Sequence, residues 1–424
     1  MKTVLKHIQY LDPSTGQEKQ GNLVMEKGKI LGFTCESITD ADKIFDGNGM
    51  WALPGFIDMH VHFREPGGEE KETLETGSRA AAAGGFTTVV CMPNTQPAMD
   101  HFSVLNDHIK RSRQLSCHLL FMGAITRGLN GKELVDFNEY HQPGVVGVTD
   151  DGRPVANARI MLEALLKGKE HGLLVANHCE EESLMFDRSI NQGPVAKRLG
   201  LTGVSVLAEE LMVQRDLHLA KFSNCPVHIQ HVSSAESVAM IRHAKEEGIP
   251  VTAESTPHHF SLSEYAVLTR GSLAKMSPPL RTERDMEAVR EGLSDGTLDC
   301  IATDHAPHAV SDKTNDLLAS ANGVVGLETA FAAAVTNLLD SGAISLQRLV
   351  VCLSTRPAEI LGLENKGTFK TGADADVVLV DLHRRWTVSS SEFLSKSRNT
   401  PFEGMALRGR VMMTFYQGKI SFMR

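Results

Sequence analysis

The sequence predicts an α/β protein in which a (β/α)8 barrel of the TIM type is joined to a small composite β-sandwich domain built from both termini. Three observations predict this fold. The middle of the chain repeats an apolar strand followed by a helix, both ends are rich in short strands and turns, and 424 residues suffice for a large barrel with an accessory domain. We expect residues 1–52 and 361–424 to form the β domain and residues 53–360 to form the barrel.

The predicted β domain depends on similar patterns at the two ends of the chain. Residues 22–33 have the pattern of a hairpin, with Lys27 and Gly28 near its turn. Towards the other end, residues 375–381 and 409–415 are strand-like, and residues 417–419 form a turn. Both ends of the chain are rich in strands, whereas the segment between them alternates strands and helices. We therefore expect the two termini to pair into one domain.

The predicted barrel strands are short apolar runs with little alternation, as expected for parallel strands covered on both faces. They are residues 55–60, 86–92, 117–123, 144–149, 173–178, 226–232, 249–254 and 298–303. The segments between them have helical spacing, for example residues 155–169 and 204–219. Because the active site of such a barrel lies where its strands end, the residues after each strand are the candidates for chemistry.

The first predicted barrel strand ends in two histidines. His60 and His62 are two residues apart, so both side chains project from one face of a strand. Two imidazoles at the end of a strand are a suitable start for a divalent metal site, although two ordinary hydrogen-bonded histidines give the same pattern. Arg64 follows them, where its guanidinium could bind a substrate carboxylate through two parallel hydrogen bonds.

Other predicted strand ends carry further polar side chains. Asn94 follows the second strand, where it is either a functional amide or a turn residue after Pro93. The ends of the fourth, fifth, sixth and eighth strands carry Asp150, Asp151, His178, His228, His231 and Asp304. Four histidines and a carboxylate at separate strand ends are hard to obtain by chance, so a metal site is the favoured interpretation.

Composition and charge exclude several classes of protein. The net charge is −9, which argues against a nucleic-acid partner, and no run of 18 or more apolar residues predicts a membrane span. The seven cysteines are odd in number and irregularly spaced, which argues against a disulfide framework and favours a reducing cytoplasm. Cys179 stands beside His178, and we interpret it as a core residue.

Residues 58–67, Asp-Met-His-Val-His-Phe-Arg-Glu-Pro-Gly, resemble the opening metal motif of the dihydroorotases, which are metal-dependent cyclic-amide hydrolases of the amidohydrolase superfamily. The resemblance runs nearly end to end. It includes Thr-Asp-Asp-Gly at 149–152, His-x-x-His-Val-Ser at 228–233 and Glu-Ser-Thr-Pro-His-His at 254–259.

The resemblance implies a site with two zinc ions per subunit. Asp151 would bridge the two ions, with Asp150 as the second choice, in the role that a carbamylated lysine has in many relatives. The remaining ligands at the two ions would be His60, His62, His178, His231 and Asp304. Asp304 would also be the catalytic residue that accepts a proton from water, and His228 would be a core or outer-face histidine. Histidine and carboxylate ligands also admit manganese or cobalt.

The resemblance also implies a substrate site, from which this chain departs in two places. The residues at that site would be His62, Arg64, Asn94, Ser277, His308, Asn322 and Gly323. Ser277 stands where dihydroorotases usually have asparagine, and Ser-Ala-Asn-Gly at 320–323 replaces a segment like Ala-Pro-Phe-Gly. These departures leave the exact substrate open, and residues 309–323 could act as a mobile lid.

The implied activity is the reversible hydrolysis of (S)-dihydroorotate to N-carbamoyl-L-aspartate, a step of pyrimidine (UMP) synthesis in the cytoplasm. Three alternatives stay open: a hydantoinase or allantoinase, a weakly active structural subunit of an aspartate carbamoyltransferase complex, and a metal-free binding protein. Arg64 argues against a hydantoinase, and the intact ligand set argues against a purely structural subunit. A homodimer and a partnership with the transferase are both left open.

Overall fold

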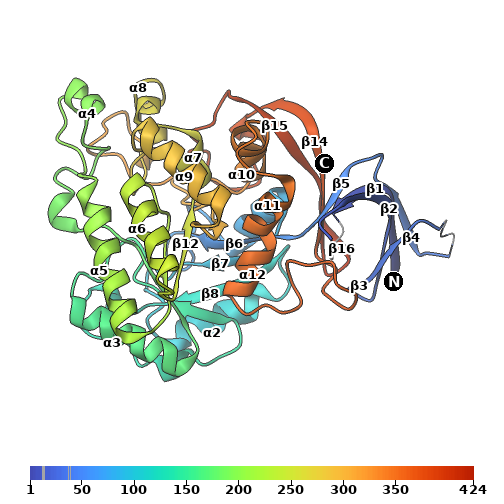
Figure 1. The fold of residues 1–424 in the computed structure, drawn as a ribbon, viewed down its shortest axis with the longest axis horizontal. Helices are drawn as coiled ribbons and strands as arrows, with labels where there is room; N and C mark the ends of the chain where they lie inside the picture. Colours follow the sequence, from blue (N-terminus) through green and yellow to red (C-terminus); the bar gives the residue numbers. More distant parts are fainter. Residues whose placement is uncertain (12–14, 37, 39) are drawn as a thin grey trace.

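The computed structural model describes residues 1–11, 15–36, 38 and 40–424. It consists of a barrel surrounded by helices and, beside it, a sheet in which both ends of the chain lie (Figure 1). The sheet and the barrel together confirm the predicted fold class. The boundaries at residues 52 and 360 stay a prediction.

The sheet beside the barrel is built from the two ends of the chain. Its strands are β1 (Lys2–Leu11), β2 (Glu18–Glu26), β3 (Lys29–Thr34), β4 (Lys43–Asp46), β5 (Trp51–Pro54), β14 (Val377–Thr387), β15 (Ala406–Tyr416) and β16 (Lys419–Met423). Their order is β16-β15-β14-β5-β1-β2-β3, and β4 also pairs with β1. The two ends meet where β14 runs antiparallel to β5, with Leu379 opposite Ala52. The hairpin predicted around Lys27 and Gly28 is confirmed.

The eight predicted barrel strands are all present and in order. They are β6 (Phe56–Val61), β7 (Phe86–Cys91), β8 (His118–Gly123), β9 (Val145–Val148), β10 (Leu174–Asn177), β11 (Val227–Ile229), β12 (Val251–Ser255) and β13 (Cys300–Ile301). Neighbouring strands are parallel from β6 to β13, and a bridge between Val61 and His305 connects the first strand to the end of the last. The ends of all eight strands therefore meet on one face of the barrel.

The helices alternate with these strands along the chain. The α-helices are α1 (Leu74–Ala83), α2 (Phe102–Ser112), α3 (Ala158–His171), α4 (Pro194–Leu199), α5 (Leu207–Ser223), α6 (Ala235–Glu246), α7 (Pro257–Ser261), α8 (Val267–Arg270), α9 (Glu283–Asp295), α10 (Ala330–Ala334), α11 (Leu346–Val350) and α12 (Arg356–Ile360). The predicted helix at 155–169 begins later, at Ala158, because the side chain of Asn157 accepts hydrogen bonds from the first exposed backbone amides of α3.

Shorter helical segments complete the chain. The 310 helices are η1 (Arg127–Leu129), η2 (Phe137–Tyr140), η3 (Glu182–Leu184), η4 (Glu264–Ala266), η5 (Gly271–Ala274), η6 (Val310–Asp312) and η9 (Ser390–Glu392), and the π-helical turns are η7 (Val335–Leu339) and η8 (Val351–Thr355). No helix among the described residues has both the length and the apolar composition needed to cross a bilayer.

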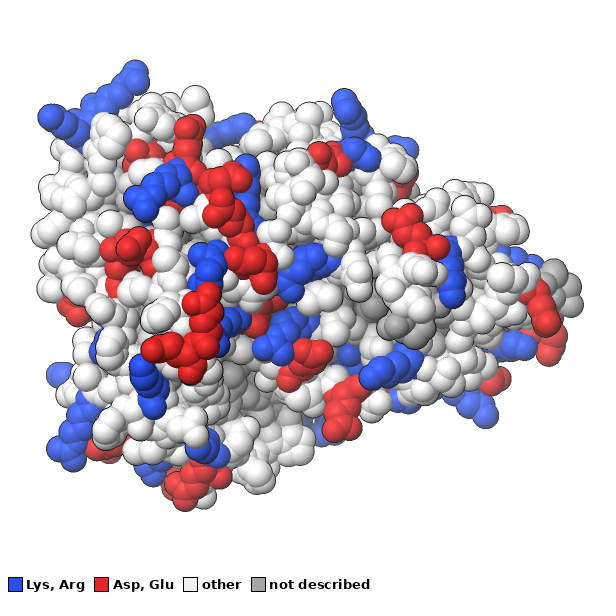
Figure 2. All heavy atoms as spheres, in the orientation of Figure 1, with Lys and Arg blue, Asp and Glu red and all other residues white. Residues whose placement is uncertain are grey.

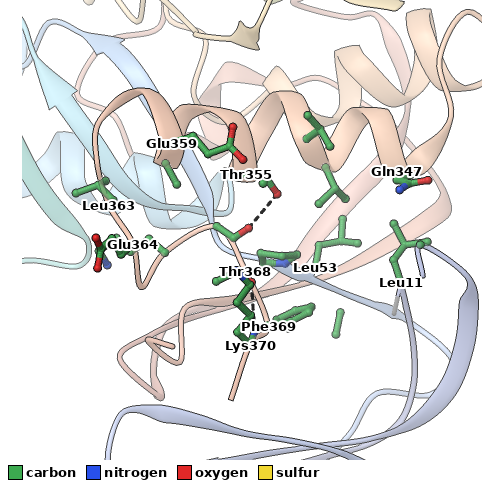
Figure 3. A pocket seen from close by; sticks show the side chains of 18 of the residues that line it. Leu11, Leu53, Gln347, Thr355, Glu359, Leu363, Glu364, Thr368, Phe369 and Lys370 are labelled. Carbon is green, nitrogen blue, oxygen red and sulfur yellow. Dashed lines mark hydrogen bonds between the residues drawn. The ribbon is translucent and has the colours of Figure 1, made fainter. Parts of the chain in front are cut away.

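The sheet and the barrel are held together by packing and by a few polar contacts. The side chain of Thr414 on β15 donates a 2.7 Å hydrogen bond to the carbonyl of Ala82 on α1. A cavity of about 600 Å³ lies between β5 and the helices α11 and α12, where Leu53, Gln347 and Phe369 line it (Figure 3). Among the residues that the structure describes, none of the predicted metal or substrate residues lines this cavity.

The surface charge is mixed. Figure 2 shows Lys and Arg side chains interspersed with Asp and Glu side chains over the face that it draws. All seven cysteines lie in the described part of the chain and are unpaired, six of them buried and Cys35 exposed.

Candidate metal centre and active site

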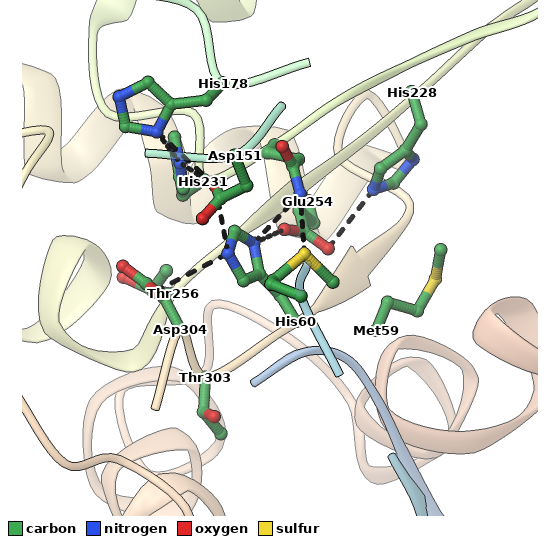
Figure 4. Close-up of polar contacts among 12 residues, drawn as sticks. Met59, His60, Asp151, His178, His228, His231, Glu254, Thr256, Thr303 and Asp304 are labelled. Atoms are coloured by element: carbon green, nitrogen blue, oxygen red, sulfur yellow. Dashed lines mark hydrogen bonds and ion pairs between the residues drawn. The ribbon is translucent and has the colours of Figure 1, made fainter. Parts of the chain in front are cut away.

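The four predicted histidines and Asp151 meet at the strand ends of the barrel. Figure 4 shows His60, His178 and His231 around Asp151. One carboxylate oxygen of Asp151 lies 3.3 Å from Nε2 of His60, 3.5 Å from Nδ1 of His178 and 3.7 Å from Nε2 of His231. Its other oxygen lies 3.4 Å from Nε2 of His62. Asp151 is therefore shared by two histidine pairs, His60 with His62 and His178 with His231.

These residues fit a metal site on the geometry of their own atoms. Two groups have ligand atoms that all lie within 4.8 Å of one another, His60–His62–Asp151 and Asp151–His178–His231. All five side chains are buried. Nε2 of His60 and Oδ1 of Asp151 have no hydrogen-bond partner among the described residues, and they face each other. Buried polar atoms normally have a partner, and a divalent cation between these would supply one.

Asp304 lies beside this group. Its Oδ1 is 2.9 Å from Nε2 of His62 and 3.6 Å from Nε2 of His60. Burial disfavours the charged form of both Asp304 and Asp151. The surrounding imidazoles outweigh that effect and hold the pKa of each carboxyl below its usual range. Both side chains are therefore ionised at neutral pH, as a metal ligand or a general base must be.

The backbone places the side chains at the strand ends in specific conformations. His60 and His62 alternate with buried apolar residues of β6, whereas Asp151, His178 and His231 follow the ends of β9, β10 and β11. His231 has φ of 34° and Asp304 has φ of 45°, which is the left-handed region that residues other than glycine rarely adopt. Such conformations cost about 1–3 kcal/mol each and are concentrated at functional sites.

Three of the histidines are oriented by a hydrogen bond on the ring nitrogen that points away from the cluster. Nδ1 of His62 is 2.9 Å from Oδ1 of Asn94, and Nε2 of His178 is 2.9 Å from Glu180. Nδ1 of His60 is 2.8 Å from Oε1 of Glu254. Each bond leaves the other ring nitrogen directed at the centre, an arrangement typical of metal-ligating histidines.

Sequence reasoning missed Glu180 and Glu254. Both are buried, and the hydrogen bonds of Glu254 with His228 and His60 outweigh burial and lower the pKa of that carboxyl to about 2. A signal for Glu254 was available, because it is the acidic residue at the end of a predicted barrel strand, and a buried acidic residue rarely lacks a partner.

The two residues that sequence reasoning ranked second lie elsewhere. Asp150 accepts hydrogen bonds from the backbone amides of Ile125 and Thr126, at 2.8 and 3.0 Å, and so supports a loop. His228 is buried in the barrel, where its Nε2 is 3.2 Å from Glu254. The interpretation of His228 as a core histidine is consistent with this position.

The predicted substrate residues all line one cavity, of about 230 Å³, together with Asp151, Asp304 and two of the histidines. They are His62, Arg64, Asn94, Ser277, His308, Asn322 and Gly323. The guanidinium of Arg64 donates through Nε to the carbonyl of Pro307, over 3.2 Å. The hydroxyl of Ser277 donates to the carboxylate of Glu180, the residue that orients His178.

Residues 309–323 follow a defined path along the wall of this cavity. The ammonium group of Lys313 donates to three carbonyls, those of Lys275, Ala321 and Gly323, at distances of 2.9 to 3.1 Å. Burial lowers the pKa of Lys313 to about 7. The amide of Asn399, from the far end of the chain, donates to the carbonyls of Ala306 and Gly323. Whether the segment acts as a lid stays a prediction.

Comparison with known proteins agrees with the fold. A sequence profile of the amidohydrolase family matches residues 51–421. The chain belongs to the amidohydrolase family. It is 44% identical to the dihydroorotase of Syntrophus aciditrophicus, over 99% of both chains. It is 43% identical to the dihydroorotase of Caldanaerobacter subterraneus subsp. tengcongensis, over 100% of this chain and 98% of that one.

A solved structure of another enzyme has the same architecture. The L-hydantoinase (dihydropyrimidinase) of Arthrobacter aurescens superposes with a TM-score of 0.89, over 99% of this chain and 95% of that one, at 26% identity. The overall fold is therefore shared with a hydantoinase, while the sequence is more similar to the dihydroorotases.

Proposed function

We propose that the protein is a cytoplasmic dihydroorotase, which reversibly hydrolyses the ring amide of (S)-dihydroorotate to N-carbamoyl-L-aspartate in pyrimidine synthesis. The observation that carries this proposal is a half-buried arginine, Arg64, in the same cavity as the convergent histidines and carboxylates. Dihydroorotate combines a hydrolysable ring amide with a carboxylate, and this cavity offers a group for each. The full-length similarity to dihydroorotases supports the same assignment.

We propose two zinc ions per subunit at the metal centre. Asp151 would bridge them, His60 and His62 would hold one, and His178 and His231 would hold the other. Bound there, the ions supply Lewis acidity, which makes a water molecule a stronger nucleophile and polarises the ring carbonyl. Manganese or cobalt would suit the same imidazole and carboxylate donors.

Asp304 is the proposed catalytic residue. Its carboxylate is ionised and lies within 3.6 Å of both His60 and His62, at the wall of the cavity. Asp304 accepts the proton that the attacking water loses, and it then gives this proton to the ring nitrogen as the amide bond breaks. The same residue serves the reverse reaction, in which it takes a proton from the carbamoyl nitrogen that closes the ring.

The remaining residues of the cavity bind and orient the substrate. Arg64, Asn94 and His308 would hold its carboxylate and ring, and Asn322 and Gly323 would form the wall of the cavity beside the ring. Ser277 keeps a hydroxyl at the position where an amide would reach further, and its bond to Glu180 also supports His178. Since Ser277 carries no charge, we expect its loss to affect substrate binding less than the loss of Arg64.

Turnover of L-dihydroorotate is the first expected result. The purified protein, with its metal content measured, should open the ring of L-dihydroorotate and leave hydantoin, allantoin and dihydrouracil almost untouched. Hydrolysis of hydantoin or allantoin in preference to dihydroorotate would assign the protein to that branch of the family instead. If zinc is bound but turnover appears only after addition of aspartate carbamoyltransferase, the chain acts as a subunit of that complex. Light scattering on the same samples tests the proposed homodimer.

Arg64→Gln tests the carboxylate-binding role. The variant should raise KM for dihydroorotate about 10- to 100-fold, because a charge-assisted hydrogen bond to a carboxylate contributes about 1.5–3 kcal/mol. The very low activity on dihydrouracil, which has the ring but no carboxylate, should stay at its wild-type level. Arg153→Gln is the matched control, since Arg153 is an exposed arginine shortly after Asp151. An unchanged KM in Arg64→Gln would remove Arg64 from substrate binding.

A further inference from the structure

A row of hydrogen bonds runs from the metal centre into the interior of the barrel. Oε1 of Glu254 is 2.8 Å from Nδ1 of His60, and Oε2 of the same carboxylate is 3.2 Å from Nε2 of His228. The other ring nitrogen of His228, Nδ1, is 2.8 Å from the hydroxyl of Thr252. Figure 4 shows His60, Glu254 and His228 joined in this way.

The strands of the barrel explain why these side chains meet. Thr252 and Glu254 are two residues apart on β12, so both project from the same face. His228 on β11 is paired with Thr252 in the sheet register. His60 comes from β6, which is not adjacent to β12 in the sheet, so Glu254 reaches His60 across the barrel interior. His60, His228 and Glu254 are each at most 1% exposed.

The direction of these hydrogen bonds determines where the protons lie. An ionised carboxylate only accepts hydrogen bonds, so both imidazoles donate to Glu254. With a metal ion at Nε2, His60 would carry its proton on Nδ1 and donate it to Glu254, which is the tautomer that a metal ligand requires. His228 donates through Nε2 and accepts from the hydroxyl of Thr252 through Nδ1. One consistent set of donors and acceptors satisfies the row.

We propose that Glu254 and His228 are positioning residues for the metal centre: Glu254 fixes the tautomer and ring orientation of His60, and His228 fixes the carboxylate of Glu254. This inference rests on the proposed metal-dependent function. It adds two residues that the sequence analysis did not place in the site. Neither residue lines the substrate cavity among the described residues. They therefore act through His60, and their loss should appear first in metal affinity.

Four variants at two positions separate geometry from charge. Glu254→Gln keeps an acceptor for Nδ1 of His60 but loses the negative charge, and it should weaken zinc binding about 10-fold. Glu254→Ala removes both and should weaken it about 100-fold, in the range found for partners of metal-ligating histidines. His228→Leu should weaken zinc binding by less than Glu254→Ala does, and His228→Gln, which retains a donor, should restore most of that loss.

Zinc affinity is measured by competition with a coloured chelator on the metal-stripped full-length chain. At saturating zinc, the Glu254 variants should have a lower kcat than the wild type. Their KM for dihydroorotate should stay within about 2-fold of the wild-type value, because the residues that bind the substrate are unchanged. Asp299→Asn is the matched control. It removes a buried carboxylate charge that pairs with Lys245 and Arg356 and accepts a hydrogen bond from the amide of Ala253, the residue before Glu254. Because this carboxylate does not bond to His60, zinc affinity should not change.

The outcomes distinguish this inference from the proposed function. Suppose that the wild-type chain binds zinc and hydrolyses dihydroorotate, and that Glu254→Gln and Glu254→Ala bind zinc with the wild-type affinity. This result would overturn the positioning role alone. A wild-type chain without zinc affinity or turnover would overturn the proposed function. If Glu254→Ala shows no cooperative thermal unfolding, Glu254→Gln decides the question by itself, because it preserves the shape of the buried side chain.

Discussion

Asp304→Asn and Asp304→Ala are expected to keep most of their zinc and lose nearly all turnover, with kcat falling about 10²- to 10⁴-fold. The five other proposed ligands remain in both variants, whereas neither replacement can accept a proton as a carboxylate does. Asparagine is the sharper variant, because it preserves the size of a side chain that lies 2.9 Å from Nε2 of His62. Metal analysis and steady-state kinetics on the same preparation measure both effects.

The control for this prediction is Asp312→Asn. Asp312 lies on η6 and is not among the described residues that line the cavity; it pairs with Lys71 and lies 3.6 Å from Nδ1 of His308, so the variant is a control for kcat and not for KM. Its replacement should leave kcat within about 2-fold, as is usual for an ion pair that is partly open to solvent. Turnover near the wild-type value in Asp304→Asn would remove Asp304 from the proton transfer. Loss of the metal together with turnover would instead make its main role that of a ligand.

Asp151→Ala is expected to abolish turnover by removing the metal itself. Asp151 is the side chain common to both groups of ligand atoms, so its loss leaves each histidine pair with two imidazoles and no shared carboxylate. Metal content should fall from about two to below one zinc per chain, and kcat should fall by at least about 10³-fold, since the Lewis acid is lost. Elemental analysis after gel filtration measures the content.

The neighbouring residue provides the control for Asp151. Asp150→Asn removes one charge at the next position, where the side chain bonds to the amides of Ile125 and Thr126. It should keep its zinc and lose about 1 kcal/mol of unfolding free energy, because an asparagine oxygen still accepts hydrogen bonds from these amides. If Asp150→Asn lost the metal and Asp151→Ala kept it, the bridging role would belong to Asp150.

The barrel could be predicted because each of its strands can be recognised from its own short stretch of sequence. Each strand is a short apolar run, so all eight strands were predicted in the right order. The predicted and observed boundaries differ mainly where few hydrogen bonds define the strand. The last predicted strand, at 298–303, has only Cys300–Ile301 in the sheet. The convergence of His60, Asp151, His178 and His231 followed from the rule that parallel strands end on one face.

The partners of those ligands could not be predicted in the same way. Glu254 reaches His60 across the interior of the barrel, and no spacing in the sequence records which inward side chains face each other. Asn399 is a similar case. It lies far along the chain from Ala306 and Gly323, whose carbonyls it binds, and nothing around it distinguishes it from an ordinary loop asparagine. Contacts of this kind depend on how distant segments pack.

The sheet that joins both ends of the chain has a consequence for biosynthesis. Strand β5 leads directly into the first barrel strand, β6, yet its partner β14 lies more than three hundred residues later, where Leu379 meets Ala52. A ribosome therefore releases most of the barrel while one edge of β5 is still unpaired. Exposed strand edges promote association between chains. The nascent protein should thus depend on chaperones until its final strands emerge, and a premature stop near the end of the message would be as damaging as one in the barrel.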